Sequence, residues 1–278
     1  MEIVLITGSS SGIGWETAKL LASKGYRVYG TTRSLASCPD SSSTAKTSFG
    51  DQFQFLEMDV TKAESIKECV DQIIVKEGKI DILVGNAGFG LCGSIEEMPD
   101  DLTQKQFDVN VFGLLRTVKA VLPHMRSRNS GRIILVSSVS SSMVIPYQAH
   151  YSATKYAVDA FTEGLRHELH GTKIKASAVR PGHMRTNFPK RMVVVKPADS
   201  PYSRWFKVAL KSISKNISTA PMPQVTAKKI VTILEKRWPK TFYSSGAMIE
   251  QLAPVAMQLL PSAIKEKFIR RFYGIDFK

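Results

Sequence analysis

Short apolar segments alternate with longer amphipathic segments through the first two thirds of the chain. Six apolar runs are rich in Val, Ile and Leu and mostly continuous, as is typical of strands that are buried on both faces of a sheet. They predict strands at Ile3–Ile6, Arg27–Thr32, Gln54–Met58, Ile80–Val84, Arg132–Ser137 and Lys173–Val179. Helical periodicity between them predicts helices at Gly12–Lys24, Ala63–Glu77, Thr103–Arg126 and Tyr151–His170. This alternation implies an α/β fold, a doubly wound parallel sheet with helices on both faces.

Two segments lack the regular alternation. Residues 34–51 are rich in Ser, Thr and Ala, and we expect a long loop there. Residues 183–223 mix Met, Phe, Trp and Lys with several prolines, and the clean alternation of strand and helix fades there.

The last part of the chain predicts a helix at Gln224–Arg237 and a short strand at Thr241–Ser244. Apolar residues follow at helical spacing. Because proline disrupts a helix interior, we expect Pro254 and Pro261 to break this tail into short helices.

The net charge of +14 is concentrated in the last third of the chain. Residues 196–278 contain 15 Lys or Arg and 5 Asp or Glu. The region lacks interleaved exposed aromatic residues and any known reader motif, so we expect no nucleic-acid partner. Attraction to an anionic substrate, to cofactor phosphates or to an anionic membrane surface stays open, as does a merely solvated basic surface.

Cysteine and histidine positions give no sign of a disulfide framework or a metal site. The chain has three cysteines without metal-ligand spacing, which predicts free thiols in a reducing compartment, and its five histidines are scattered. A strand predicted at Ile3–Ile6 leaves no room for a secretory signal before it. No uninterrupted apolar run approaches the roughly 18 residues of a membrane span. We expect a cytoplasmic protein, with membrane association through the basic C-terminal region left open.

Glycines occupy the turn between the first predicted strand and the first helix. Residues 7–14 read Thr-Gly-Ser-Ser-Ser-Gly-Ile-Gly. Glycine lets the backbone approach a pyrophosphate, and the N–H groups of the following helix N-terminus can point at it. The residues alone leave a second interpretation open, namely a turn that serves only tight strand–helix packing.

Tyr151 and Lys155 lie four residues apart in a predicted helix and therefore share one face. A nearby ammonium favours the phenolate, so we expect the pKa of Tyr151 to lie below its usual value of about 10. Such a tyrosine can exchange a proton with a carbonyl or alcohol oxygen. Ser138 lies thirteen residues before it.

Together with Asn86-Ala87-Gly88 and Asn110, these motifs resemble the short-chain dehydrogenase/reductase family, whose pattern nearly all of residues 2–190 follow in order. As a whole, the sequence resembles the branch of this family that holds 17β-hydroxysteroid, retinol and acyl-dihydroxyacetone-phosphate oxidoreductases. The resemblance implies a single Rossmann-like domain over residues 1–278. It would comprise a cofactor-binding and catalytic core at 1–182, a substrate loop at 183–223 and a C-terminal helical extension at 224–278.

The end of the second predicted strand indicates the cofactor. NAD-preferring relatives carry an acid where this chain has Thr32, and Arg33 lies beside it. A guanidinium can bind a phosphate through charge-assisted hydrogen bonds, so the pair predicts NADP(H). An exposed arginine without a ligand is the alternative.

The resemblance implies further cofactor contacts after other strands. Asp59 would contact the adenine amino group with Val60 beside the ring, and the backbone of 86–88 would lie along the adenosine ribose. The family often has a second Asn where this chain has Gly85. After Pro181, the His183 backbone and the Thr186 hydroxyl would hold the nicotinamide carboxamide. The implied cofactor-binding set is Gly8, Ser10, Ser11, Gly12, Ile13, Gly14, Thr32, Arg33, Asp59, Val60, Asn86, Ala87, Gly88, Tyr151, Lys155, Pro181, Gly182, His183 and Thr186.

The resemblance also assigns four catalytic roles. Tyr151 would be the general acid in reduction and the base in oxidation, and Ser138 would orient the substrate oxygen. Lys155 would lower the tyrosine pKa and bind the nicotinamide ribose. Asn110 would hold the helix geometry and a water that connects Lys155 to solvent.

Two segments are expected to line the substrate pocket, residues 143–147 and 183–223, both rich in apolar side chains. This composition favours a large apolar alcohol or ketone. The predicted substrate contacts are Ser138, Met143, Tyr147 and Tyr151. Packing of these apolar residues against the core is the competing interpretation.

The sequence therefore predicts an NADP(H)-dependent oxidoreductase that interconverts a carbonyl and an alcohol on a steroid, retinoid or lipid-like substrate. The alternative is a catalytically silent NADP(H)-binding regulator or a membrane-peripheral scaffold. The resemblance also implies a homodimer or homotetramer paired through the helices predicted at Thr103–Arg126 and Tyr151–His170.

Overall fold

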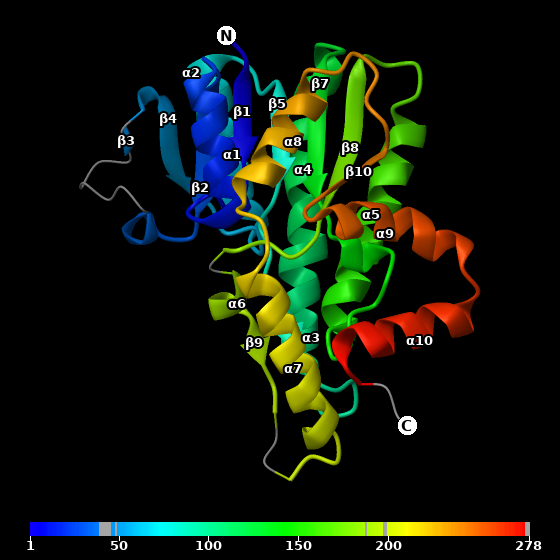
Figure 1. The fold of residues 1–278 in the computed structure, drawn as a ribbon. Coiled ribbons are helices and arrows are strands. Elements are labelled where there is room, and N and C mark those ends of the chain that lie inside the picture. Colours follow the sequence, from blue (N-terminus) through cyan, green and yellow to red (C-terminus); the bar gives the residue numbers. More distant parts are fainter. Residues whose placement is uncertain (39–45, 48, 187, 197–198, 276–278) are drawn as a thin grey trace.

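The main sheet has the strand order β10-β8-β7-β5-β1-β2-β4-β3 (Figure 1). The computed structural model describes residues 1–38, 46–47, 49–186, 188–196 and 199–275. Neighbouring strands of this sheet pair in parallel, except that β3 is antiparallel to β4. Helices cover both faces, so the predicted doubly wound α/β architecture is confirmed.

The strands agree closely with the apolar runs. Within the described residues, the main sheet consists of β1 Ile3–Ile6, β2 Arg27–Thr32, β3 Lys46–Thr47, β4 Gly50–Glu57, β5 Ile82–Gly85, β7 Gly131–Val136, β8 Ile174–Pro181 and β10 Phe242–Ser245. Two short strands that periodicity did not reveal, β6 Leu91–Cys92 and β9 Val193–Val194, pair with each other in a small parallel sheet.

The described α-helices are α1 Gly12–Ser23, α2 Ala63–Glu77, α3 Asp100–Phe107, α4 Leu114–Ser127, α5 Ala149–Glu168, α6 Phe188–Arg191, α7 Ser203–Ser218, α8 Gln224–Leu234, α9 Met248–Leu259 and α10 Ser262–Tyr273. Part of the expected loop at 34–51 is ordered as a 3₁₀ turn at Leu35–Ser37, as β3 and as the start of β4. Its residues 39–45 and 48 lie outside the described residues.

Two apolar clusters hold the helices against the sheet. One packs α2, α4 and α5 on one face, with Leu5, Leu83 and Ile133 fully buried at its centre. The other packs α1 and α8 on the opposite face around Val4 and Val28. Each strand thus buries both of its faces, which explains why the runs are continuous rather than alternating.

The single helix predicted at Thr103–Arg126 is divided. A π-helical turn at Asp108–Gly113 separates α3 from α4. Its buried Asn110 side chain binds the backbone of Phe89 in both directions, as acceptor at 3.0 Å and as donor at 2.9 Å. The wider helical turn occurs where these hydrogen bonds form, and the spacing of apolar residues in the sequence does not reveal it.

The expectation for the two tail prolines holds at one of them. Pro261 separates α9 from α10, but α9 continues through Pro254. Pro254 and Met257 are both buried, so packing outweighs the one backbone hydrogen bond that the proline removes. No helix among the described residues is long and apolar enough to cross a membrane.

Candidate active site

The glycine turn after β1 is joined to the Asn86-Ala87-Gly88 turn after β5. The Thr7 hydroxyl oxygen accepts hydrogen bonds from the backbone N–H groups of Asn86 and Ala87 at 2.8 and 2.9 Å. The Asn86 amide in turn donates to the carbonyl oxygens of Thr7 and Gly8. Thr7 is part of the glycine motif, but no role was predicted for it from the sequence. The sequence feature that could have indicated its role is a hydroxyl side chain directly after the first strand.

Glycine is required sterically at two positions of this turn. Gly8 has φ +65°, and a Cβ there would lie 2.9 Å from Cα of Ala87. A Cβ on Gly14 would lie 2.6 Å from the Asn86 amide nitrogen and from the Gly8 carbonyl oxygen. The turn therefore also serves tight packing.

The N-terminus of α1 faces this turn and has the features of an anion-binding site. Ser11 is its N-cap, and the helix starts Gly-Ile-Gly-Trp without an acidic residue. Its dipole and first N–H groups therefore favour a phosphate group. Gly12, at φ +60°, lies under Thr186, whose Cβ would be 3.6 Å from an added Cβ. Ser10 and Ile13 complete the turn, and the arrangement fits the pyrophosphate of a dinucleotide.

The side chains expected at the adenosine end lie after β2 and β4. Thr32 is buried and its hydroxyl donates to the Ser34 carbonyl oxygen at 3.2 Å, whereas Arg33 is exposed. Asp59 accepts from the backbone N–H and the hydroxyl of Thr61. Burial opposes ionisation of Asp59, but these bonds and the Arg33 charge outweigh it and place its pKa below the ordinary value. Val60 is buried beside it.

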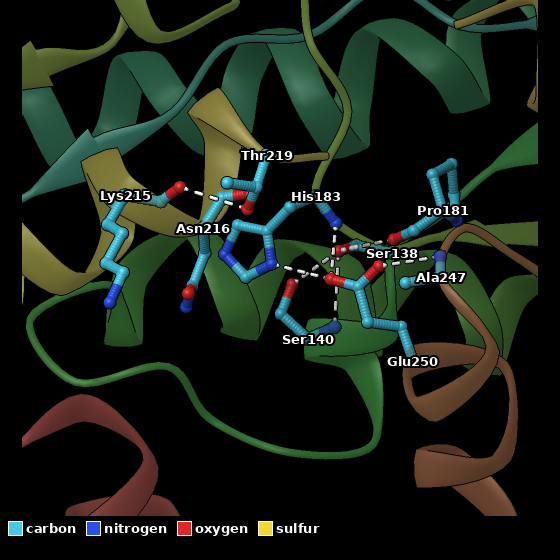
Figure 2. Close-up of polar contacts among 9 residues, drawn as sticks. All are labelled: Ser138, Ser140, Pro181, His183, Lys215, Asn216, Thr219, Ala247 and Glu250. Carbon is cyan, nitrogen blue, oxygen red and sulfur yellow. Dashed lines mark hydrogen bonds and ion pairs between the residues drawn. The ribbon is translucent and has the colours of Figure 1, made fainter. Parts of the chain in front are cut away.

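Ser138 follows β7 and lies against the segment that follows β8. Its hydroxyl donates to the Pro181 carbonyl oxygen at 3.4 Å, and the Ser140 hydroxyl lies 2.8 Å from it (Figure 2). The Ser140 backbone N–H also donates to the Ser138 oxygen at 3.2 Å. The Ser138 side chain also lies within reach of the Tyr151 phenol and lowers its pKa.

The predicted lowering of the Tyr151 pKa is wrong in this structure. Burial raises the pKa of Tyr151 to about 12, and its hydrogen bond with Ser138 offsets this only in part. Lys155 is itself buried, which lowers its pKa to about 8. Its ammonium donates to the Val136 carbonyl oxygen at 2.9 Å and lies 5.6 Å from the centre of the tyrosine ring. Desolvation therefore dominates the pKa of both groups, and the phenol is protonated at neutral pH.

Asn110 connects the π-helical turn to α5, the helix that carries Tyr151 and Lys155. Besides its two bonds with Phe89, its amide donates to the Thr154 hydroxyl at 3.2 Å. That hydroxyl donates to the Tyr151 carbonyl oxygen at 2.7 Å. Asn110 thus anchors the first turn of α5, in agreement with the predicted structural part of its role.

One ion pair beside the site was not predicted. Asp159, one turn after Lys155, accepts from Arg180 of β8 at 2.8 Å, and both side chains are buried. The Arg180 guanidinium also lies 3.6 Å over the Phe242 ring. An Asp and an Arg twenty-one residues apart give no sequence signal, because only the sheet brings them together.

The pocket segments meet in a third apolar cluster. Ile145 and Phe206 are buried there with Cys92, Ile213 and Tyr273, and the ring of Tyr147 packs edge-on against Phe206 at 5.1 Å. Phe188, which sequence reasoning did not single out, lies 5.7 Å from the Tyr151 ring. Met143 is half-buried before Ile145. The structure thus supports the packing interpretation for the residues of this cluster, and their contact with a substrate stays a prediction.

Comparison with known proteins agrees with this geometry. A family model described as short chain dehydrogenase matches residues 2–193. The chain belongs to the short-chain dehydrogenase/reductase family. It is an oxidoreductase of the class that acts on alcohol or carbonyl groups with a nicotinamide cofactor.

Three relatives in this family have related substrates in their names. The chain is 34% identical to a 3-ketodihydrosphingosine reductase of Bacteroides thetaiotaomicron over 99% of its own length and 98% of the relative's. It is 34% identical to human retinol dehydrogenase 8, covering 85% of this chain and 78% of that one. It is 32% identical to mouse 17-beta-hydroxysteroid dehydrogenase type 1, covering 87% and 73%. The predicted similarity to the retinol and 17β-hydroxysteroid oxidoreductases of the family is therefore confirmed.

Solved structures share the whole fold. A short-chain dehydrogenase from Streptomyces avermitilis superposes with a TM-score of 0.82 at 26% identity, covering 99% of this chain and 100% of that one. A serine dehydrogenase complexed with NADP+ has a TM-score of 0.76 at 25% identity, covering 88% and 94%. A family member from Burkholderia phymatum in complex with NAD, at 22% identity and covering 93% and 92%, shows the same fold with a TM-score of 0.78.

The buried Lys155 predicts a pH dependence of stability. Its folded-state pKa of about 8 lies below the unfolded value, so the unfolded chain binds more protons between about pH 8 and 10.5. The Lys155 contribution to the free energy of unfolding should therefore rise by about 2 kcal/mol from pH 7.5 to 9.5. Urea unfolding of wild type and Lys155→Met at both pH values measures this difference. Lys173→Met, which removes an exposed lysine, is the control. Equal pH dependence in wild type and Lys155→Met would contradict the assignment.

Proposed function

We propose that this chain is an NADP(H)-dependent oxidoreductase that interconverts an apolar ketone or aldehyde and its alcohol. The proposal rests mainly on one observation: Ser138, Tyr151 and Lys155 lie together beside the Pro181–Thr186 segment. These residues are at the carboxyl edge of the sheet, where ligands bind in open α/β folds.

The nicotinamide cofactor, when bound along the glycine turn and the Pro181–Thr186 segment, would supply the hydride for the carbonyl carbon. The protein residues manage the proton and the oxygen. Tyr151, protonated at neutral pH, donates its phenolic proton to the substrate oxygen as negative charge develops there. Ser138 donates a hydrogen bond to the same oxygen and orients it. Lys155 carries the cationic charge that stabilises the phenolate left behind.

A large apolar substrate fits the third cluster. Phe188 lies 5.7 Å from the Tyr151 ring, and the third cluster includes Tyr147, Phe206, Met192 and Val194. Polar groups concentrate at the catalytic end, which suits a hydrocarbon body with one oxygen function. The names of the sphingolipid, retinol and steroid relatives support the same substrate class.

The intact set of Asn110, Ser138, Tyr151 and Lys155 argues against the alternative of a silent regulator. Tyr151→Phe removes the proton donor and should reduce turnover of an apolar ketone by 10²-fold or more. NADPH affinity should change little, because the ring is retained. Steady-state rates and fluorescence titration measure the two quantities. Tyr156→Phe, an exposed tyrosine one turn along on α5, is the matched control. Activity of Tyr151→Phe within a few-fold of wild type would refute the mechanism.

The preference for NADP(H) rests on Thr32 and Arg33. The double change Thr32→Asp with Arg33→Ala places a carboxylate near the 2′-phosphate and removes its cation. A charge-assisted hydrogen bond contributes roughly 1.5–3 kcal/mol, so the ratio of NADPH to NADH affinity should fall about ten-fold to more than a hundred-fold. Fluorescence titration with both cofactors measures the ratio, and Arg126→Ala, an exposed arginine on α4, is the control. An unchanged ratio would remove the basis for NADP(H).

We also infer self-association through α4 and α5, as family members pair. Exposed apolar side chains at Phe112, beside the start of α4, and at Tyr156 and Phe161 of α5 support this.

A second surface favours contact with an anionic membrane. On α9 and α10, large apolar side chains are exposed: Met248, Ile249, Leu252, Val255, Leu259, Ile264, Phe268 and Phe272. Helix α10 also carries four basic residues and one acidic residue. The two helices extend from the end of β10, and α10 contacts α7 of the substrate loop (Figure 1). Exposed apolar residues among basic ones suit an anionic bilayer.

Wild type should therefore co-sediment with vesicles rich in phosphatidylglycerol, and much less with phosphatidylcholine vesicles. Leu252→Ser with Phe268→Ser should weaken vesicle binding ten-fold or more, since each buried side chain contributes about 1.5–3 kcal/mol. Val75→Ser, at an 88% exposed position on α2, is the control. Wild type that stays in the supernatant with both vesicle types would refute this contact.

A further inference from the structure

A carboxylate from the C-terminal helix α9 reaches the segment after β8 that carries His183. Oε1 of Glu250 accepts the His183 backbone N–H at 2.8 Å and lies 2.7 Å from its Nδ1 (Figure 2). Oε2 accepts the backbone N–H of Ala247, the N-cap of α9, at 3.1 Å. The Glu250 and His183 side chains are each only 11% exposed. Both carboxylate oxygens are thus committed to donors in a nearly closed environment.

The backbone around Glu250 leaves room for this carboxylate and for nothing larger. A Cβ on Gly182 would lie 2.2 Å from Oε2, and one on Gly246 would lie 2.7 Å from the same atom. Gly246 also has φ +133°, which other residues rarely adopt. The Gly182 N–H donates to the Ser245 carbonyl oxygen at 2.8 Å, so β10 and the segment after β8 enclose the carboxylate together.

Electrostatics keep Glu250 ionised. Burial alone would raise its pKa, but the His183 side chain, the His183 N–H and the Ala247 N–H outweigh burial and place the pKa below the ordinary value. Glu250 is therefore a fixed negative charge at neutral pH, and its hydrogen bonds are charge-assisted.

The segment that Glu250 holds joins the two ends of the site. At one end, the Pro181 carbonyl oxygen accepts the Ser138 hydroxyl at 3.4 Å. At the other end, Thr186 lies over Gly12 of the glycine turn. His183 is in the middle, and its backbone N–H donates to Glu250.

We propose that Glu250 is a positioning residue that fixes the Pro181–Thr186 segment for the nicotinamide end of the cofactor, so that the C-terminal extension contributes to cofactor binding. This inference rests on the proposed function. Glu250 lies well beyond residue 193, where the family-model match ends, and it contacts the site at Gly182 and His183.

The substitution Glu250→Gln tests the role with little change in shape. An amide has one acceptor oxygen, so either His183 or Ala247 would face an NH₂ group instead of an acceptor. The position of His183 should loosen while the glycine turn and the Thr32–Arg33 region stay intact. Glu266→Gln, an exposed carboxylate on α10, is the matched control.

The test compares two ligands by isothermal titration calorimetry: NADPH, and 2′-phospho-ADP-ribose, which is the same molecule without nicotinamide. Glu250→Gln should weaken NADPH about ten-fold, equivalent to about 1.4 kcal/mol, and leave 2′-phospho-ADP-ribose within two-fold of wild type. Glu266→Gln should change neither affinity.

Unchanged NADPH affinity in Glu250→Gln would overturn the proposal. Equal weakening of both ligands would overturn it as well, because it would indicate general disruption of the site. Thermal unfolding verifies that the variant is folded. If Glu250→Gln does not fold, the same comparison is made with Glu250→Asp, which keeps the charge and shortens the reach. If the proposed function itself is wrong, the wild-type chain does not bind NADPH, and this result differs from both outcomes above.

Discussion

One chain of hydrogen bonds connects the cofactor turn to the catalytic helix. Thr7, at the end of β1, accepts the N–H groups of Asn86 and Ala87 after β5. Two residues on, Phe89 is bound in both directions by Asn110 of the π-helical turn. Asn110 donates to Thr154 in α5. The position of Tyr151 relative to the glycine turn therefore depends on buried polar groups, each of which is costly to leave unpaired.

Three charged side chains of α5 and β8 are buried beside the site, and each has a partner. Lys155, Asp159 and Arg180 all lie in or beside α5 and β8 with little exposure. Asp159 and Arg180 compensate each other at 2.8 Å, and Lys155 donates to a backbone carbonyl. Burial keeps Tyr151 protonated and lowers the pKa of Lys155 to about 8, so the proposed proton donor lies beside an amine that titrates near neutral pH.

The parts that sequence predicted well are those that local pattern determines. Strands β1 and β2 and helix α2 have the predicted bounds because continuous apolar runs and helical period report burial directly. The Ser138–Tyr151 spacing and the glycine turn specified the catalytic edge. The π-helical turn, the Arg180–Asp159 pair and the Glu250–His183 contact were not predictable, because each depends on partners that only the tertiary fold brings together. The tyrosine pKa was predicted in the wrong direction, since the sequence indicates a neighbouring charge but not how deeply it is buried.

The C-terminal extension has two faces with different surroundings. The inner side of α9 places Glu250 against the segment after β8, and its outer side exposes Leu252 and Val255. Helix α10 buries Tyr273 in the cluster that borders the substrate loop while Phe268 and Phe272 face outward.

The activity proposed for the residues at this edge of the sheet is the reduction of a carbonyl group on an apolar substrate. The most direct measurement is single-turnover oxidation of bound NADPH, followed by its absorbance, with a panel of steroid, retinoid and long-chain acyl ketones or aldehydes. At least one member of the panel should cause NADPH loss, with one alcohol formed per NADPH consumed. Tight NADPH binding without consumption by any member of the panel would contradict it and would favour the silent NADP(H)-binding regulator.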